Sequence, residues 1–277
     1  MQAHLTDFSY GWLTPALAYA FSFLGCLTGL KATARARTTV GAQRARWLAL
    51  AAVAIGGTGI WVMHFVAILG FSATGTDIRY NLSITVASWL TAVVVVGIGL
   101  FAVGYGNPTI TKVIIAGFFT GIGVAGMHYT GVGAMEMDGV KSYSRPLVIL
   151  SVVIAVVASI VAFWFTVTIR RTLGVIVAAA IMALAVCSMH YVGIEAMSVH
   201  LNSTGAPVNG INPMYMMVPI FIFVTLVVLA LAYGMLNSIS DEDAAELAAI
   251  GERAGSGGRP LPGGAPRQSA GFRVRQG

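Results

Sequence analysis

The sequence predicts an all-α fold: a polytopic membrane helix bundle with seven transmembrane helices that contain three parallel two-helix repeats. Three observations predict it. Hydrophobic residues make up 57% of the 277 residues and charged residues only 9%, whereas a soluble domain carries about 25% charged residues. Seven apolar runs are long enough to cross a bilayer, and one short motif recurs inside three of them. So few charges could not keep a soluble domain of this length in solution.

A helix needs about 20 apolar residues to cross a hydrocarbon core that is about 30 Å thick. The runs that meet this requirement lie near 11–30, 47–71, 82–105, 113–135, 147–169, 173–197 and 214–236. The first run is expected to be a retained span, because residues 1–30 contain no Lys or Arg and therefore lack the basic start of a cleaved signal peptide.

The domain organisation follows from a change in composition after the last apolar run. We expect a seven-span membrane domain over 1–237 and a short cytoplasmic tail over 238–277. The tail is rich in Gly, Pro, Ser and Arg and is expected to be largely disordered. Because about forty residues cannot hold a catalytic domain, the chain is not expected to be an enzyme.

The orientation follows from the basic residues between the spans. Thirteen of the 16 Lys and Arg residues fall in the first, third and fifth loops and the tail, and only Arg79, Lys141 and Arg145 fall on the other side. The positive-inside rule then places the N-terminus outside and the C-terminus in the cytoplasm of a bacterial cytoplasmic membrane. The charge of +6 forms no basic stripe, so we expect the lipid bilayer as a partner and no nucleic acid.

Three Met-His pairs inside apolar runs reveal an internal duplication. The pairs are Met63-His64, Met127-His128 and Met189-His190, so equivalent residues are 64 and 62 positions apart. This spacing equals one two-span hairpin, which makes the three motif helices parallel and places the histidines at one depth in the outer half of the membrane. Small residues precede each pair and are expected to let the motif helices approach one another: Gly57, Gly59, Gly121, Gly123, Ala183 and Ala185.

Histidine and methionine together are typical ligands of copper. Imidazole binds many transition metals, whereas the soft thioether selects Cu(I). Adjacent residues point about 100° apart on a helix, so the ligands of one ion are expected to come from different helices. The structural alternative is a duplicated helix whose histidines only bond to neighbouring helices, but ionisable residues inside a membrane are costly and favour a functional site.

Two further sets of residues accompany the motif. An aromatic residue follows each histidine, as Phe65, Tyr129 and Tyr191, and at the two tyrosines a phenol could orient an imidazole. Eight residues beyond two of the motif methionines stand Met135 and Met197, which we consider as an outer path for the metal.

The threefold motif resembles that of the bacterial MHYT-domain family of integral membrane sensors, over roughly residues 10–240. Tyr129, Thr130 and Tyr191 match the end of the family motif, whereas Phe65 departs from it. The resemblance implies a copper site made by the three Met-His pairs and a response to a diatomic gas (O2, CO or NO) or to copper itself. Family members often carry cytoplasmic output domains. We expect none here, so a sensor of this kind would need a separate cytoplasmic signalling partner.

Two other functions stay open at the level of the sequence. The first is copper uptake or delivery across the membrane, which a ladder of methionines through the bilayer would favour. Only Met182 and Met235 lie inward of the motif layer. The second is a b-type haem held by two of the histidines.

Overall fold

The computed structural model describes residues 4–6, 9–202, 207–230 and 233. Met1–Leu231 forms one compact unit. The predicted tail over 238–277 lies outside the described residues, so its predicted disorder stays a prediction.

Seven helical segments in the described residues are long and apolar enough to span a membrane, which confirms the predicted bundle. They are α1 (Leu13–Thr38), α2–η1–α3 (Gly41–Ala52, Val53–Val62 and Met63–Leu69), α4 (Leu82–Gly104), α5 (Ile110–Gly133), α6 (Arg145–Thr168), α7 (Thr172–Glu195) and a last helix, Pro213–Ala230. The first helix extends eight residues beyond its predicted end at residue 30. The second begins at Gly41, a glycine with a φ of 57° that reverses the chain after Thr38.

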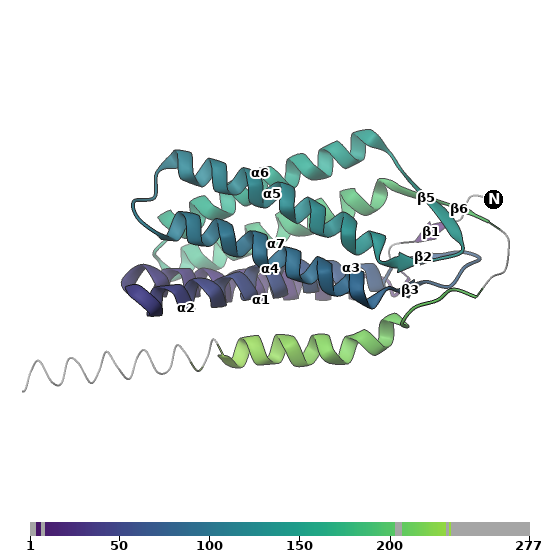
Figure 1. The fold of residues 1–277 in the computed structure, drawn as a ribbon, viewed down its shortest axis with the longest axis horizontal. Coiled ribbons are helices and arrows are strands. Elements are labelled where there is room, and N and C mark those ends of the chain that lie inside the picture. Colours follow the sequence, from purple (N-terminus) through teal and green to yellow (C-terminus); the bar gives the residue numbers. More distant parts are fainter. Residues whose placement is uncertain (1–3, 7–8, 203–206, 231–232, 234–277) are drawn as a thin grey trace, which may run out of the picture. The chain divides into compact units, whose positions relative to one another are not determined.

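Short strands that the sequence did not predict join the helices at one end of the bundle (Figure 1). They form three antiparallel pairs: β1 (Leu5–Thr6) with β2 (Ser72–Ala73), β3 (Arg79–Tyr80) with β4 (Met135–Glu136), and β5 (Gly139–Tyr143) with β6 (Met197–Leu201). In each pair, one strand precedes a helical hairpin and the other follows it. The structural repeat is therefore strand, helix, helix, strand, and the last helix lies outside the three repeats.

Three equivalent backbone hydrogen bonds support this frame. The N–H groups of Ser9, Asn81 and Ser144 donate to the carbonyls of Gly70, Ala134 and Ala196, over 2.9, 2.9 and 2.8 Å. Each acceptor lies seven residues after a motif methionine. The end of each motif helix is therefore held by an equivalent backbone hydrogen bond, and this places the three histidines at one level along the bundle.

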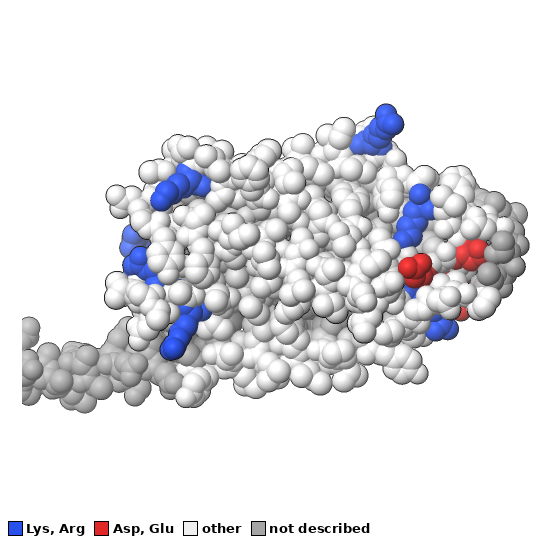
Figure 2. Space-filling view, viewed as in Figure 1, with Lys and Arg blue, Asp and Glu red and all other residues white. Residues whose placement is uncertain are grey.

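The outer faces of the bundle are apolar. Large side chains such as Ile98 and Phe119 are about two-thirds exposed. On the face shown in Figure 2, charged residues lie toward the two ends and leave a band of uncharged residues across the middle. Exposed apolar surface of this extent would be unstable in water and fits a lipid environment. The protein is a multi-pass membrane protein.

The first motif helix occupies the centre of the bundle. In the span Gly41–Leu69, 89% of the most apolar stretch is buried, against 39% for α5 and for α7. Its middle part, η1, is a π-helix that contains Gly56, Gly57 and Gly59. π-Helical segments are rare and occur often at functional sites.

One sequence expectation about packing is wrong. The glycines that precede the motifs do not bring the motif helices together. A Cβ added at Gly121 would lie 2.4 Å from Val156 Cα on α6, and one at Gly123 would lie 2.6 Å from Val95 on α4. Gly59 packs against Gly25 and Cys26 of α1. These glycines pack the first two motif helices against non-motif neighbours, and the expectation for Ala183 and Ala185 stays a prediction.

Candidate metal centre

The three motif histidines meet inside the bundle, and we call them the histidine triad. The Nδ1 atom of His64 lies 2.9 Å from Nδ1 of His190 and 3.2 Å from Nδ1 of His128. The ring centroids are 4.9 to 5.1 Å apart, and every pair of rings meets nearly edge to face. All three side chains are at most 1% exposed. The predicted convergence of the histidines is confirmed.

The parallel repeats explain why three residues so distant in sequence meet. Each histidine lies six residues before the carbonyl that accepts one of the equivalent backbone bonds. The three imidazoles therefore reach the bundle interior at the same height, near the end that carries the strands. A one-residue shift in any motif helix would turn its histidine by about 100° and remove it from the cluster.

Two glycines on the neighbouring motif helices make room for the rings. A Cβ at Gly131 would lie 2.3 Å from Nε2 of His64, and a Cβ at Gly193 would lie 2.3 Å from Nε2 of His128. Both glycines stand four residues after a motif methionine. The equivalent position in the first repeat is Ala67, so the site departs from threefold symmetry there. Sequence reasoning missed these glycines, although their place in the repeat was visible.

The spacing of the nitrogen atoms suits a single transition-metal ion. A metal at about 2.0 Å from three nitrogens requires the nitrogens to be about 3.3 to 3.5 Å apart. The potential ligand atoms of the triad all lie within 4.8 Å of one another, and the two closest pairs are at 2.9 and 3.2 Å. A small outward movement of the rings would accommodate an ion. This buried group could therefore hold a metal.

Among the His, Cys, Asp and Glu side chains that the structure describes, the cluster contains only the three imidazoles. Among the described residues, no cysteine or carboxylate joins the cluster. If Nδ1 is the ligand atom, the proton lies on Nε2, and the buried Nε2 atoms of His64 and His128 have no hydrogen-bond partner in the described residues. Metal-binding histidines usually donate this second N–H, and close packing against Gly131 and Gly193 also holds the rings of His64 and His128 in place.

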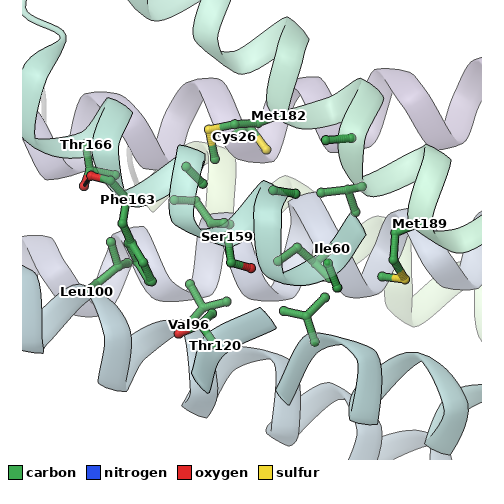
Figure 3. Close-up of a pocket in the computed structure, with 17 residues that line it drawn as sticks. Cys26, Ile60, Val96, Leu100, Thr120, Ser159, Phe163, Thr166, Met182 and Met189 are labelled. Atoms are coloured by element: carbon green, nitrogen blue, oxygen red, sulfur yellow. Dashed lines mark hydrogen bonds between the residues drawn. The ribbon is translucent and has the colours of Figure 1, made fainter. Parts of the chain in front are cut away.

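The motif methionines are buried with the histidines. Met63, Met127 and Met189 are at most 2% exposed. Met189 lines an apolar cavity of about 50 Å³ in the core of the bundle, together with Cys26 and Met182 (Figure 3). This cavity extends from Met189 to Leu100 and Thr166. A sulfur ligand to the same ion as the imidazoles stays a prediction.

The other residues that the sequence predicted for the site lie around the triad. Met135 on β4 and Met197 on β6 are buried, and their part in an outer metal path stays a prediction. Phe65 stacks on Trp61, with ring centroids 5.5 Å apart. Tyr191 packs edge-on against its neighbour His190, 5.0 Å away.

The hydroxyl of Tyr129 does not reach an imidazole. It donates to Ser151 Oγ on α6 over 2.7 Å, because the Ser151 hydroxyl itself donates to the Val148 carbonyl. The ring of Tyr129, and not its hydroxyl, is the part that lies beside His128, 4.9 Å away. In this structure the Tyr129 hydroxyl is bonded away from the triad, and a role of Tyr129 in orienting an imidazole stays a prediction.

Lys141 on β5 supports the end of α5 outside the spans. Its Nζ donates to the carbonyls of Val132 and Met135. Burial lowers the pKa of Lys141, and the nearby charge of Glu136 opposes this shift. The sequence placed Lys141 in an outer loop and gave no signal of this contact.

Fold and site together define a multi-pass membrane protein with a buried centre of three histidines. The chain belongs to the MHYT family: the family profile, described as a bacterial signalling protein N terminal repeat, matches residues 57–116 and 121–179. The third motif copy, at Met189 and His190, lies outside both matched segments and is identified by its structural equivalence.

Curated relatives are bacterial signalling proteins. The chain is 34% identical over 230 residues, or 81% of its length, to the bifunctional diguanylate cyclase/cyclic di-GMP phosphodiesterase MucR of Pseudomonas aeruginosa. It is 30% identical over 199 residues, 70% of its length, to the cyclic di-GMP phosphodiesterase NbdA of the same organism, and 28% identical over 183 residues, 66% of its length, to an uncharacterized signaling protein of Caulobacter vibrioides. The matched regions make up 33%, 25% and 22% of these relatives. No solved structure matches the chain significantly.

Proposed function

We propose that this chain is a membrane sensor whose histidine triad binds copper, and that the bound copper responds to a diatomic gas or to copper supply. The convergence of three buried Nδ1 atoms carries the proposal. The Nδ1 atoms of the three neutral imidazoles face one another inside an apolar bundle, and a cation among them would accept a lone pair from each.

The charge of the surroundings favours Cu(I) over a divalent ion. Three neutral imidazoles bring no negative charge, and no carboxylate belongs to the cluster in the described part of the chain. A divalent ion would leave two uncompensated charges in a region of low dielectric constant, and Cu(I) would leave one. The buried sulfurs of Met63, Met127 and Met189 are soft donors one residue from each imidazole, which also suits Cu(I).

The gas response depends on the coordination number. A centre of three protein ligands leaves a fourth position open to an exogenous ligand, as catalytic three-histidine centres do. O2, CO and NO are small and apolar enough to cross the membrane interior. The chain's own contribution is to hold the imidazoles in place and to exclude water from them.

The signalling role rests on the relatives. MucR and NbdA are named for synthesis or hydrolysis of cyclic di-GMP, and this chain matches a third of the first and a quarter of the second. We propose that the chain performs the sensory step for a cyclic di-GMP enzyme and does not itself catalyse that chemistry. The signal would travel as a shift between two packings of the motif helices.

Metal content tests the proposal directly. The whole chain is purified without chelators, and copper, zinc and iron per protein are measured for wild type, for the triple variant His64→Ala/His128→Ala/His190→Ala, and for His200→Ala. His200 is an exposed histidine on β6 and serves as the matched control. We expect about one copper in wild type and in the control, and almost none in the triple variant. A folded triple variant with wild-type copper content would refute the triad as the site, and zinc or iron in its place would refute copper.

Two spectra test the ligand and the haem alternative. We expect reduced, copper-loaded protein to show a C–O stretching band under carbon monoxide, and the triple variant to lack it. Absence of the band from loaded wild type would refute the gas response. The three rings are in contact, so a porphyrin would have to separate them. An intense Soret band in the purified protein would nevertheless establish haem.

A further inference from the structure

A second cavity lies at the end of the bundle opposite the strands. It has a volume of about 230 Å³ and is enclosed by the ends of α1, α2, α4 and α6 and by the loops after α4 and α6. Arg37 of α1, Arg44 of α2 and Arg170 of the loop after α6 line it. Its volume is many times what one water molecule needs. None of the residues of the histidine triad lines it.

Two of the arginines are held in place by backbone carbonyls. The two terminal nitrogens of Arg37 donate to the carbonyls of Thr166 and Ile169 at the end of α6. The Nε of Arg44 donates to the carbonyls of Ala36 and Thr39 at the end of α1, over 3.1 and 2.8 Å. The guanidinium groups are therefore positioned before any ligand arrives, which reduces the entropy lost on binding.

These bonds leave strong donors unused. A guanidinium has five N–H groups, and Arg44 uses only the one on Nε, so its two terminal amino groups have no hydrogen-bond partner among the described residues. Arg170 is exposed and close enough to Arg37 for their charges to repel. An anion in the cavity would meet free N–H groups and would relieve this repulsion.

No acidic side chain in the described ranges neutralises the cavity. The described acidic residues are Asp77, Glu136, Asp138 and Glu195, and all four lie in the loops, strands or helix end at the opposite, strand-bearing end. In Figure 2, red atoms appear only at that end, whereas blue atoms appear at both ends. The partial negative charge of the helix ends offsets only part of three full positive charges.

Membrane topology accounts for the arginines only in part. The positive-inside rule explains basic residues in these loops, and capping of helix ends explains the Nε of Arg44 and the terminal nitrogens of Arg37. Neither accounts for a cavity into which three arginines from three different segments converge. A surface arginine with a purely topological role extends into solvent and needs no cavity.

We propose that this cavity binds the phosphate group of an anionic ligand, either the headgroup of an anionic phospholipid or a soluble phosphate compound. Phosphate offers several acceptor oxygens to guanidinium groups that approach from different directions, and arginine forms paired hydrogen bonds with it. A chloride ion would fill little of the volume and would accept from few of the donors. The site lies where a helix bundle meets lipid headgroups, so both sources can reach it.

Binding to the purified whole chain tests the proposal, with two matched substitutions. Arg44→Gln removes the guanidinium group whose terminal amino groups are free. Arg46→Gln removes an exposed charge on the same helix, and the Arg46 side chain does not line the cavity. Arg170→Gln is a third variant, whose side chain makes no hydrogen bond to a described residue and whose loss should not affect folding. Thermal melts establish that each variant is folded.

The two ligand sources are measured separately. Native mass spectrometry compares retention of phosphatidylglycerol and phosphatidylcholine, and thermal melts compare inorganic phosphate with chloride at equal ionic strength. We expect Arg44→Gln and Arg170→Gln each to weaken phosphate-dependent binding by about tenfold or more, and Arg46→Gln to behave as wild type. Selective loss of phosphatidylglycerol identifies the lipid as the source, and selective loss of stabilisation by inorganic phosphate identifies a soluble compound.

Equal binding by wild type, Arg44→Gln and Arg170→Gln in both measurements would overturn the proposal. If Arg44→Gln does not fold, Arg170→Gln against Arg46→Gln decides the question alone. Copper content is not involved in any of these readouts, so the result is independent of the histidine triad.

Discussion

His64 and His190 lie 126 residues apart in sequence, and their Nδ1 atoms lie 2.9 Å apart in the bundle. His64 also contacts His128 through the same atom, over 3.2 Å. The residue at the centre of the cluster therefore comes from the helix that is most deeply buried. An ion held here would be shared by all three repeats, and each repeat would supply one ligand.

Single substitutions in the triad should act on one shared site. We expect His64→Ala, His128→Ala and His190→Ala each to reduce copper affinity by more than about 100-fold, because loss of a direct ligand should exceed the roughly 10- to 100-fold effect of losing an indirect partner. The effects should not add, since the first substitution already destroys the site. Competition with a Cu(I) chelator measures each affinity, and additive losses in the double variants would argue for separate sites.

The glycine beside His64 offers a test that leaves every candidate ligand in place. We expect Gly131→Ala to displace the His64 imidazole, because the new Cβ would lie 2.3 Å from Nε2, and so to lower copper affinity. Gly126→Ala is the matched control on the same helix, where a Cβ meets nothing within 4 Å. The control should bind normally and be slightly more stable, because alanine favours helix. Equal copper affinity in the two variants would contradict the tight packing around His64.

Tyr129 should contribute to stability and not to metal binding. Tyr129→Phe removes the 2.7 Å hydrogen bond to Ser151 and keeps the ring beside His128. We expect the free energy of unfolding to fall by about 1 kcal/mol, with copper affinity unchanged. Ser151→Ala should have a similar effect, and the double variant should cost less than the sum of the two. A large loss of copper from folded Tyr129→Phe would instead show that the phenol acts on the site.

The bundle could be predicted from the sequence because lipid imposes strong rules. Seven long apolar runs in a chain with few charges predict a bundle of seven membrane-spanning helices. The spacing of His64, His128 and His190 predicts that their three helices are parallel and that the histidines lie at one depth in the membrane. The strands could not be predicted, because pairs as short as Leu5–Thr6 with Ser72–Ala73 carry no pattern of their own. They form only when the helix ends bring them together.

The direction in which each small residue faces was also beyond the sequence. Gly121 and Gly131 lie on one helix, yet Gly121 faces α6 and Gly131 faces His64. Two residues that are ten positions apart on a helix differ by about 1000° of rotation, so they point roughly 80° apart. This periodicity does not say which neighbouring helix each face contacts. That choice depends on the order of helices around the bundle.

The orientation of the protein can be tested with single cysteines. We replace the buried native Cys26 and Cys187 with alanine and introduce Ser142→Cys on β5 or Gln43→Cys at the start of α2, both at exposed positions. Because thirteen Lys and Arg residues lie on the Gln43 side of the predicted spans, we expect a membrane-impermeant maleimide to label Ser142→Cys in intact cells and to miss Gln43→Cys until the cells are lysed. The reverse pattern would contradict the predicted topology.

Lys141 should give the protein a specific dependence on pH. Burial lowers its pKa below the ordinary value of 10.5, so in the window just below 10.5 the unfolded chain binds more protons at this site than the folded protein does. Stability must then rise with pH through that window, and the full cost of the buried charge is present at lower pH. Thermal melts between pH 8 and pH 10.5 measure this, with Lys141→Met as an uncharged reference and Lys141→Arg as one that stays charged. We expect wild type to gain melting temperature relative to both references as the pH rises. A constant difference would mean that the bonds to Val132 and Met135, together with Glu136, fully compensate the burial of the ammonium group.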